Sequence, residues 1–209
     1  RGLGDVYKRQ DKAYGKKMKL ESSAPVVSIS MNDKADIYYQ EINCALTGIN
    51  GLIKAGNEKI SYNSKLIGEF NAENIISAVS AGITLNVSPK DIENAIGKTN
   101  SIEGRMEIFK TRDEKSIVVD YAHTPDSYFK VLSTLKKLLN NQYKMHVLFG
   151  CGGDRDRSKR NEMGKIAAKF AYKIWITPDN PRHENIEQIN SEITKGIDRK
   201  KFEVFKNRE

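Results

Sequence analysis

The sequence predicts an α/β fold whose C-terminal part contains a mostly parallel sheet. From about residue 103 onward, short apolar runs alternate with amphipathic helical stretches. This alternation is typical of a parallel sheet joined by crossover helices. Polar clusters directly follow three of the apolar runs, and open α/β sheets bind ligands at the carboxyl ends of their strands. The pattern before residue 103 differs, so we expect a boundary near residues 101–104.

The part before this boundary is expected to hold a small sheet and two helices. Short β-prone runs broken by Asn and Gly favour an antiparallel layer, and they cover residues 25–30, 36–44, 46–53 and 58–62. Apolar residues spaced three and four apart predict a helix over residues 71–85. Pro89, directly after Ser88, marks the first turn of a second helix that runs to residue 96.

The part after the boundary holds the alternating elements. The predicted strands cover residues 106–109, 116–119, 145–149, 174–177 and 202–205. The predicted helices cover residues 127–139, 161–172 and 186–197. The first two strands are expected to pair with each other, and the others to form the parallel sheet.

The first ten residues, RGLGDVYKRQ, show neither strand alternation nor helical periodicity. They resemble a translated adapter sequence, and we interpret them as foreign to the fold. The alternative is a genuine terminal segment without regular structure.

The composition indicates a globular chain with an excess of positive charge. Of 209 residues, 35 are Lys or Arg and 27 are Asp or Glu, which gives a formal net charge of +8. A solvated surface or an anionic small molecule accounts for this charge, and the absence of densely interleaved basic and aromatic residues argues against a nucleic-acid partner. No apolar run is long enough to span a membrane, so we expect no membrane partner. Two cysteines make no disulfide framework, which favours the reducing cytoplasm.

The first polar cluster, residues 119–126, follows the strand predicted to end at residue 119. Asp120 at a strand end can accept hydrogen bonds from ribose hydroxyls. His123 can contact a phosphate, which the N-terminus of the following helix also favours. Alternatively, Asp126 caps that helix and His123 is an ordinary loop residue.

The second cluster, residues 149–160, combines three glycines with four basic residues. Glycines let a backbone approach a ligand closely, and Arg155 can bind a carboxylate or phosphate through two hydrogen bonds. The GxxxxGK[ST] pattern of a phosphate-binding loop is absent. Cys151 has no recognisable His and acid partners, so we expect a small-residue role for it rather than nucleophilic chemistry.

The third cluster, residues 177–184, has two prolines that stiffen the loop and direct Asn180 and Arg182. An amide and a guanidinium on a rigid loop can recognise a carboxylate. Earlier in the chain, Asn71 and Asn74 share a helix face and can read an adenine edge, although N-capping by Asn71 explains it equally well.

Taken together, these stretches resemble the Mur ligases, specifically the branch that adds the third residue of the peptidoglycan stem. The similar stretches occur in the family's order over roughly residues 11–209: GEFNAEN, EGRMEI, VVDYAHTPDS, FGCGGDRDRSKR, MGKIAAKFA and TPDNPRHE. The resemblance implies ATP-driven formation of an acyl phosphate on UDP-N-acetylmuramoyl-L-alanyl-D-glutamate. The amine of the incoming amino acid then displaces phosphate, with Mg2+ and basic groups neutralising charge.

The resemblance also assigns roles to individual residues. The set implied for ATP comprises Asn71, Asn74, Arg105, Asp120 and His123. The set implied for the added amino acid comprises Arg155, Asp179, Asn180, Pro181 and Arg182. The family's phosphate-binding loop, catalytic residues and metal-binding residues have no counterpart in this chain. We therefore interpret the chain as a fragment, inactive alone, that carries no catalytic residue and no metal ligand.

The added amino acid is expected to be meso-diaminopimelate. DNPR resembles the diaminopimelate-adding enzymes, and Arg182 can pair with the second carboxylate of diaminopimelate. For lysine, the same guanidinium would face an ammonium group of like charge. A lysine-adding homologue, a folylpolyglutamate synthetase and a non-catalytic module that binds an amino acid or nucleotide remain alternatives.

In domain terms, the resemblance implies that residues 11–102 are the end of a central P-loop-ATPase-like domain. Residues 103–209 would be an incomplete, Rossmann-like C-terminal domain that binds the amino acid.

Overall fold

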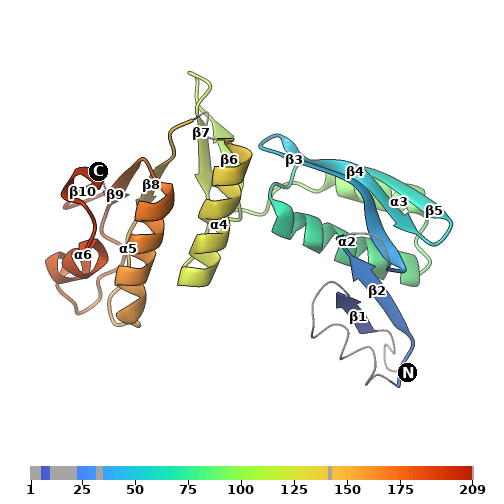
Figure 1. Cartoon of the computed structure of the whole chain (residues 1–209), viewed down its shortest axis with the longest axis horizontal. Helices are drawn as coiled ribbons and strands as arrows, with labels where there is room; N and C mark the ends of the chain where they lie inside the picture. The colour runs from blue at the N-terminus through green and yellow to red at the C-terminus, as the bar shows by residue number, and fades with distance from the viewer. Residues whose placement is uncertain (1–5, 10–22, 32–34, 141–142, 209) are drawn as a thin grey trace. The chain divides into compact units, whose positions relative to one another are not determined.

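The computed structural model describes residues 6–9, 23–31, 35–140 and 143–208. The chain divides into two compact units, Arg1–Glu107 and Ile108–Glu209. Each contains strands and helices, so the predicted α/β fold is confirmed (Figure 1). No helix in the described ranges is long and apolar enough to cross a membrane.

The first unit contains a five-stranded mixed sheet with the order β1-β2-β3-β4-β5. Its strands are β1 (Val6–Arg9), β2 (Val26–Ser30), β3 (Ile37–Ala45), β4 (Gly48–Ala55) and β5 (Glu58–Ser64). The antiparallel layer expected from the sequence is present in β3, β4 and β5, whereas β1, β2 and β3 pair in parallel. Gly56, at φ 58°, opens the two-residue turn between β4 and β5, where a left-handed conformation suits glycine.

Strand β1 lies within the ten residues in which the sequence showed no regular element. It pairs in parallel with β2, with Val6 opposite Val26 and Arg9 opposite Ile29. A strand of four residues is too short for its alternation to be recognised. The other residues of that segment, 1–5 and 10, lie outside the described ranges, and the foreign origin of the segment stays a prediction.

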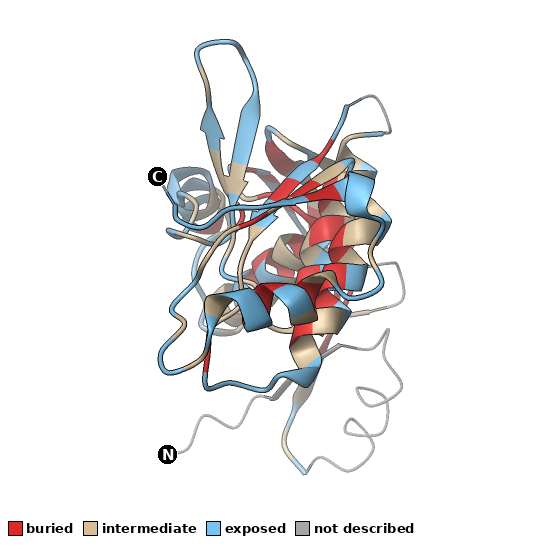
Figure 2. Ribbon diagram, turned by 90° about the vertical axis from the view of Figure 1, so that its left-hand side faces the viewer, coloured by how far each residue is buried: buried red, intermediate tan, exposed pale blue. Residues whose placement is uncertain are grey.

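Two helices pack on this sheet. Helix α2 (Glu69–Thr84) buries Ile75, Ile76 and Val79, and helix α3 (Pro89–Lys98) packs against β5. The hydroxyl of Tyr39 donates a hydrogen bond of 2.7 Å to the carbonyl of Ala72, which joins β3 to α2. The buried residues of α2 recur three and four apart, which is the apolar periodicity from which the sequence predicted this helix, whereas α3 was predicted from Pro89. Figure 2 colours the whole ribbon by burial, with buried positions in red and exposed positions in pale blue.

The second unit contains a hairpin and a parallel sheet. Strands β6 (Glu107–Lys110) and β7 (Ser116–Val119) form a two-stranded sheet. Strands β8 (His146–Phe149), β9 (Lys173–Ile176) and β10 (Phe202–Val204) are parallel, in the order β10-β9-β8. Helix α5 (Ser158–Phe170) connects β8 to β9, and helix α6 (Ile186–Thr194) follows β9. The predicted parallel arrangement is therefore correct, and a short 3-10 helix, Arg199–Lys201, was not foreseen.

Helix α4 (Pro125–Leu138) begins two positions before the predicted residue 127. Thr124 caps it, because its hydroxyl accepts a hydrogen bond from the backbone N–H of Ser127. In return, the hydroxyl of Ser127 accepts one from the backbone N–H of Thr124. The alternative that Asp126 caps the helix is wrong, since Asp126 instead pairs with Lys130 at 2.6 Å. The true cap leaves Asp120 and His123 in the loop before the helix.

Candidate functional site

A pocket of about 1020 Å³ lies in the second unit, where the loops after β7, β8 and β9 meet. It collects side chains from all three polar clusters, as the carboxyl-end rule predicts. Five residues of the predicted site line it: Asp120, His123, Arg155, Asp179 and Arg182. Tyr121, Lys159 and Arg160, which lie in the predicted clusters but were given no individual role, also line it, as does Arg208, which the sequence did not indicate.

The glycines after β8 allow two loops to lie in direct contact. A Cβ on Gly153 would lie 1.8 Å from the carbonyl oxygen of Pro181, and one on Gly150 would lie 2.1 Å from that of Thr177. The N–H of Gly153 donates to the carbonyl of Asn180 at 2.9 Å. The loop after β8 therefore lies directly against the loop after β9, while Gly150 and Gly152 also line the pocket, so close approach of a ligand to this backbone stays a prediction.

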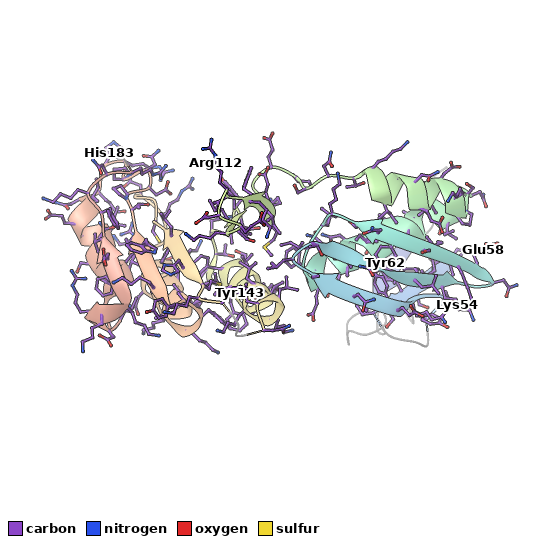
Figure 3. All side chains as sticks on the ribbon, turned by 90° about the horizontal axis from the view of Figure 1, so that it is seen from above. Lys54, Glu58, Tyr62, Arg112, Tyr143 and His183 are labelled. Atoms are coloured by element: carbon purple, nitrogen blue, oxygen red, sulfur yellow. The ribbon has the colours of Figure 1, made fainter. Side chains whose placement is uncertain are left out.

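Glu184 joins the same two loops by charge. Its carboxylate accepts hydrogen bonds from Arg160 at 2.7 and 2.9 Å, from Arg157 at 2.6 and 3.0 Å, and from the N–H of Asp154 at 2.6 Å. These bonds, those from Arg160 first, hold the pKa of the Glu184 carboxyl well below its usual range. His183, labelled in Figure 3, adds a contact of 2.7 Å between its Nδ1 and Asp154 Oδ2, which lowers the pKa of Asp154.

Two of the predicted arginines are directed to the pocket in different ways. Arg182 has φ 48° and donates from Nη1 to the carbonyl of Gly153 at 2.6 Å, so its guanidinium is anchored at one end. Arg155 lines the pocket with an exposed side chain, and no hydrogen bond or ion pair joins that side chain to another described residue. Of these two arginines, Arg182 is therefore held by a hydrogen bond and Arg155 has all its side-chain donors available among the described residues. Guanidinium groups are well suited to bind carboxylates.

The loop after β9 also contributes a carboxylate. Asp179 Oδ1 accepts a hydrogen bond of 2.8 Å from Arg208, whose Nε donates to the carbonyl of Pro178 at 2.6 Å. Asn180 and Pro181, both predicted to bind the amino acid, do not line this pocket. The Asn180 side chain accepts from the N–H of Arg182 at 3.2 Å and so shapes the turn that carries Arg182.

The loop after β7 brings Asp120 and His123 to the same pocket. Asp120 is half-buried, and its Oδ1 accepts a hydrogen bond of 2.8 Å from the N–H of Ala122. His123 is exposed, with Nδ1 3.2 Å from the carbonyl of Tyr121, and the two rings meet edge to face at 5.5 Å. A carboxylate and an imidazole beside the N-terminus of α4 have the chemistry that the sequence analysis expected for a nucleotide.

The other predicted nucleotide residues belong to the first unit. Asn74 donates to the side-chain oxygen of Asn71 at 3.2 Å, and Asn71 donates to the carbonyl of Ile67 at 2.8 Å. The two amides therefore share one face of α2, as predicted. Gly68, not Asn71, occupies the N-cap position, so the capping alternative for Asn71 is wrong. Arg105 is exposed in the segment before β6.

Cys151 lines the pocket without the properties of a nucleophile. Burial raises the pKa of its thiol to about 11, so the thiolate is scarce at neutral pH. Within the described ranges, no group of three or more His, Cys, Asp or Glu residues is arranged to hold a metal ion.

The sequence placed Arg160 and Glu184 in two of the polar clusters but did not predict that they pair. Arg160 and Glu184 are separated by 24 positions and belong to no shared short motif. Only the packing of the two loops brings them together.

The fold defines two α/β units, the second of which carries a pocket at the carboxyl ends of its strands. The chain belongs to the Mur ligase family. Residues 104–209 match the family model described as the Mur ligase, glutamate ligase domain, and residues 5–82 match the Mur ligase middle domain. The membership that the sequence motifs indicated is therefore confirmed.

Curated relatives are similar to this chain over nine tenths of its length or slightly less. The UDP-N-acetylmuramoyl-L-alanyl-D-glutamate–2,6-diaminopimelate ligase of Rickettsia rickettsii is 39% identical over 181 residues, which cover 87% of this chain and 37% of that protein. The enzyme of the same name from Trichormus variabilis is 39% identical over 191 residues, covering 90% of this chain and 38% of that protein. The chain thus spans well under half the length of the relatives it matches.

Solved structures agree with the fold. A UDP-N-acetylmuramoyl-L-alanyl-D-glutamate–2,6-diaminopimelate ligase is 32% identical with a TM-score of 0.69, and the match covers 98% of this chain and 43% of that chain. The folylpolyglutamate synthase of Mycobacterium tuberculosis complexed with ADP has a TM-score of 0.68 at 16% identity, covering 92% of this chain and 42% of that one. The second likeness is one of fold alone.

Proposed function

We propose that this chain is part of an ATP-dependent ligase that adds meso-diaminopimelate to UDP-N-acetylmuramoyl-L-alanyl-D-glutamate during synthesis of peptidoglycan precursors. Within that enzyme, the pocket of the second unit holds the amino acid. The relatives named above carry the name of that activity.

The observation that carries the proposal is the charge of the pocket. Arg155 and Arg182 offer guanidinium groups, and Asp179 offers a carboxylate, all within one pocket. Diaminopimelate carries two carboxylates and two ammonium groups, so it matches a pocket that holds both signs. Lysine lacks the second carboxylate and would leave one guanidinium without a partner, which costs binding energy where the group is desolvated.

For the nucleotide, we propose that Asn71 and Asn74 contact the adenine, Asp120 the ribose, and Arg105 and His123 the phosphates. The support is the resemblance of their motifs, together with the position of Asp120 and His123 in the pocket. ATP supplies the phosphoryl group that activates the glutamate carboxylate as an acyl phosphate, and the family employs Mg2+ for this. We assign no metal ligand to this chain.

The part of the reaction that belongs to this chain is the delivery of the amine. The pocket would orient diaminopimelate so that one of its amines reaches the activated carboxyl carbon, which converts a bimolecular step into one within the complex. The bond formed is an amide, and inorganic phosphate leaves. We propose that this takes place in the cytoplasm, in keeping with two cysteines that are both unpaired.

The test is an isothermal titration of the chain with meso-diaminopimelate and, separately, with L-lysine. We expect meso-diaminopimelate to bind at least 10-fold more tightly, because only it satisfies both guanidinium groups. Tighter binding of lysine would favour a lysine-adding enzyme. Binding of neither amino acid would overturn the proposed role of the pocket.

A further inference from the structure

We propose that Arg160 is a positioning residue that sets the distance between Arg155 and Arg182 and thereby determines the affinity for the amino acid. Arg160 acts by holding the loop after β8 against the loop after β9. The inference deepens the proposed function and rests on it, since the pocket must take an amino acid for the distance to matter.

The contacts of Arg160 reach both loops and a helix at once. Nη2 donates to the carbonyl of Gly152 at 3.1 Å and to Glu184 at 2.7 Å. Nη1 donates to the other oxygen of Glu184 at 2.9 Å and to Glu192 on α6 at 2.7 Å. One planar guanidinium therefore fixes three segments relative to one another, and the paired bonds to Glu184 also fix its orientation.

Arg160 does not have the donors left to bind a substrate itself. An arginine has five N–H donors, and the four terminal ones are used in the bonds above. The remaining Nε–H is buried and has no hydrogen-bond partner among the described residues. The side chain is only 1% exposed, although it lies at the wall of the pocket. Its influence on a ligand must therefore pass through its neighbours.

Those neighbours carry the residues that face the ligand. Gly152 and Asp154 flank Gly153, which accepts a hydrogen bond from Arg182 and donates one to Asn180. Arg155 follows in the same loop. A shift of the loop after β8 would therefore move Arg155 and alter the anchor of Arg182 together. The distance between the two guanidinium groups distinguishes a diamino dicarboxylic acid, whose two carboxylates can contact both, from a shorter amino acid or one with a single carboxylate.

The substitution Arg160→Lys would keep the positive charge and remove the planar guanidinium with its paired N–H donors. A single ammonium group cannot span Gly152, both oxygens of Glu184 and Glu192 in the same geometry. The matched control is Arg199→Lys, because Arg199 makes a hydrogen bond to the carbonyl of Phe202 and does not line the pocket. Should Arg160→Lys fail to fold, Glu184→Gln removes the charged partner and receives the same measurements.

The first measurement is amide hydrogen exchange of the chain without ligand. In the Arg160→Lys variant, the amides of Gly153 and Asp154 should exchange at least 10-fold faster than in the wild type. The amides of Ile174 and Ile176 in β9 should be unchanged, which shows that the fold is intact. Unchanged exchange at Gly153 and Asp154 would overturn the loop-fixing role.

The second measurement is the affinity for meso-diaminopimelate in a double-mutant cycle. Arg160→Lys should weaken binding 10-fold or more, whereas Arg199→Lys should not change it. In a background that already carries Arg182→Lys, the same Arg160→Lys change should cost less than 3-fold, because one of the two guanidinium groups whose distance Arg160 sets has been removed. Fully multiplicative losses, or wild-type affinity in Arg160→Lys, would overturn the positioning role.

The two measurements separate this inference from the function on which it rests. If the wild-type chain binds no meso-diaminopimelate, the proposed function of the pocket fails, and the role of Arg160 in affinity fails with it. The exchange result then decides by itself whether Arg160 fixes the loops.

Discussion

In the proposed function, Arg182 is the residue on which the choice of amino acid depends most directly. It lines the pocket, its backbone is left-handed at φ 48°, and its guanidinium is held at one end by the carbonyl of Gly153. A guanidinium held in this way loses little further freedom when a carboxylate binds, so the new hydrogen bonds are realised as affinity.

Replacement of Arg182 by alanine should therefore weaken meso-diaminopimelate binding. Hydrogen bonds to charged groups are worth about 1.5–3 kcal/mol, which corresponds to roughly 10- to 150-fold in the dissociation constant. The measurement is isothermal titration, and Arg112→Ala is the control, because Arg112 is an exposed arginine of the β6–β7 turn outside the pocket (Figure 3). Equal affinities of the Arg182 variant and the wild type would contradict this assignment.

Glu184 should make the stability of the second unit depend on acidity. Its pKa in the folded protein lies below the ordinary value of 4.5, so the ionised form favours folding at neutral pH. As pH falls through the ordinary value and below it, that contribution is progressively lost. The urea midpoint of the wild type should therefore fall between about pH 5 and 3 more steeply than that of Glu184→Gln. Parallel curves for the two proteins would show that Glu184 does not contribute.

At the residue scale, the sequence predicted five of the residues that line the candidate pocket, but not the hydrogen bonds and ion pairs that hold its loops together. Asp120, Arg155 and Arg182 were predicted because each follows a strand, and the ends of strands meet. The pairing of Arg160 with Glu184 was not predictable, since it depends on how closely two loops approach. The same contact gives the glycines after β8 a second role, the close packing of two loops, which the sequence did not predict.

At the scale of elements, the close packing of α5 on α6 is the feature with the sharpest requirement. A Cβ on Gly164 of α5 would lie 2.1 Å from the carbonyl oxygen of Ile193 in α6. Backbone cannot give way as a flexible side chain can, so glycine is needed for the two helices to touch.

Gly164→Ala should accordingly destabilise the protein, even though alanine favours helices. We expect a net loss of about 1–3 kcal/mol from overpacking. Gly97 in α3 is the matched control, because its nearest neighbour, the carbonyl of Asn63, would lie 3.9 Å from an added Cβ. Gly97→Ala should be neutral or stabilise by up to about 1 kcal/mol. Urea unfolding of both variants checks this, and equal effects at the two sites would refute it.

The elements themselves were largely predictable, and the exceptions have physical causes. Helix α3 was recognised from a proline at its first turn, and helix α4 from its apolar periodicity. The start of α4 was misplaced because the reciprocal bonds between Thr124 and Ser127 do not follow from apolar spacing. Strand β1 was missed because parallel pairing with β2 is a property of the folded sheet.

At the scale of the whole molecule, the chain contains the pocket proposed to hold the amino acid but no phosphate-binding loop sequence. We therefore expect the chain alone to release no phosphate from ATP above background, with or without UDP-N-acetylmuramoyl-L-alanyl-D-glutamate and diaminopimelate. A phosphate-release assay checks this directly. Robust turnover by the chain alone would mean that ATP hydrolysis uses residues other than those the family resemblance implies.

The central claim is that the second unit holds the amino acid. The most direct test is to map the binding of meso-diaminopimelate by NMR on the isotope-labelled chain. We predict that saturating ligand shifts the amide signals of Gly152, Gly153, Arg155 and Arg182, and leaves those of Asn71 and Asn74 unchanged. Shifts confined to the first unit, or no shifts at all, would contradict the claim.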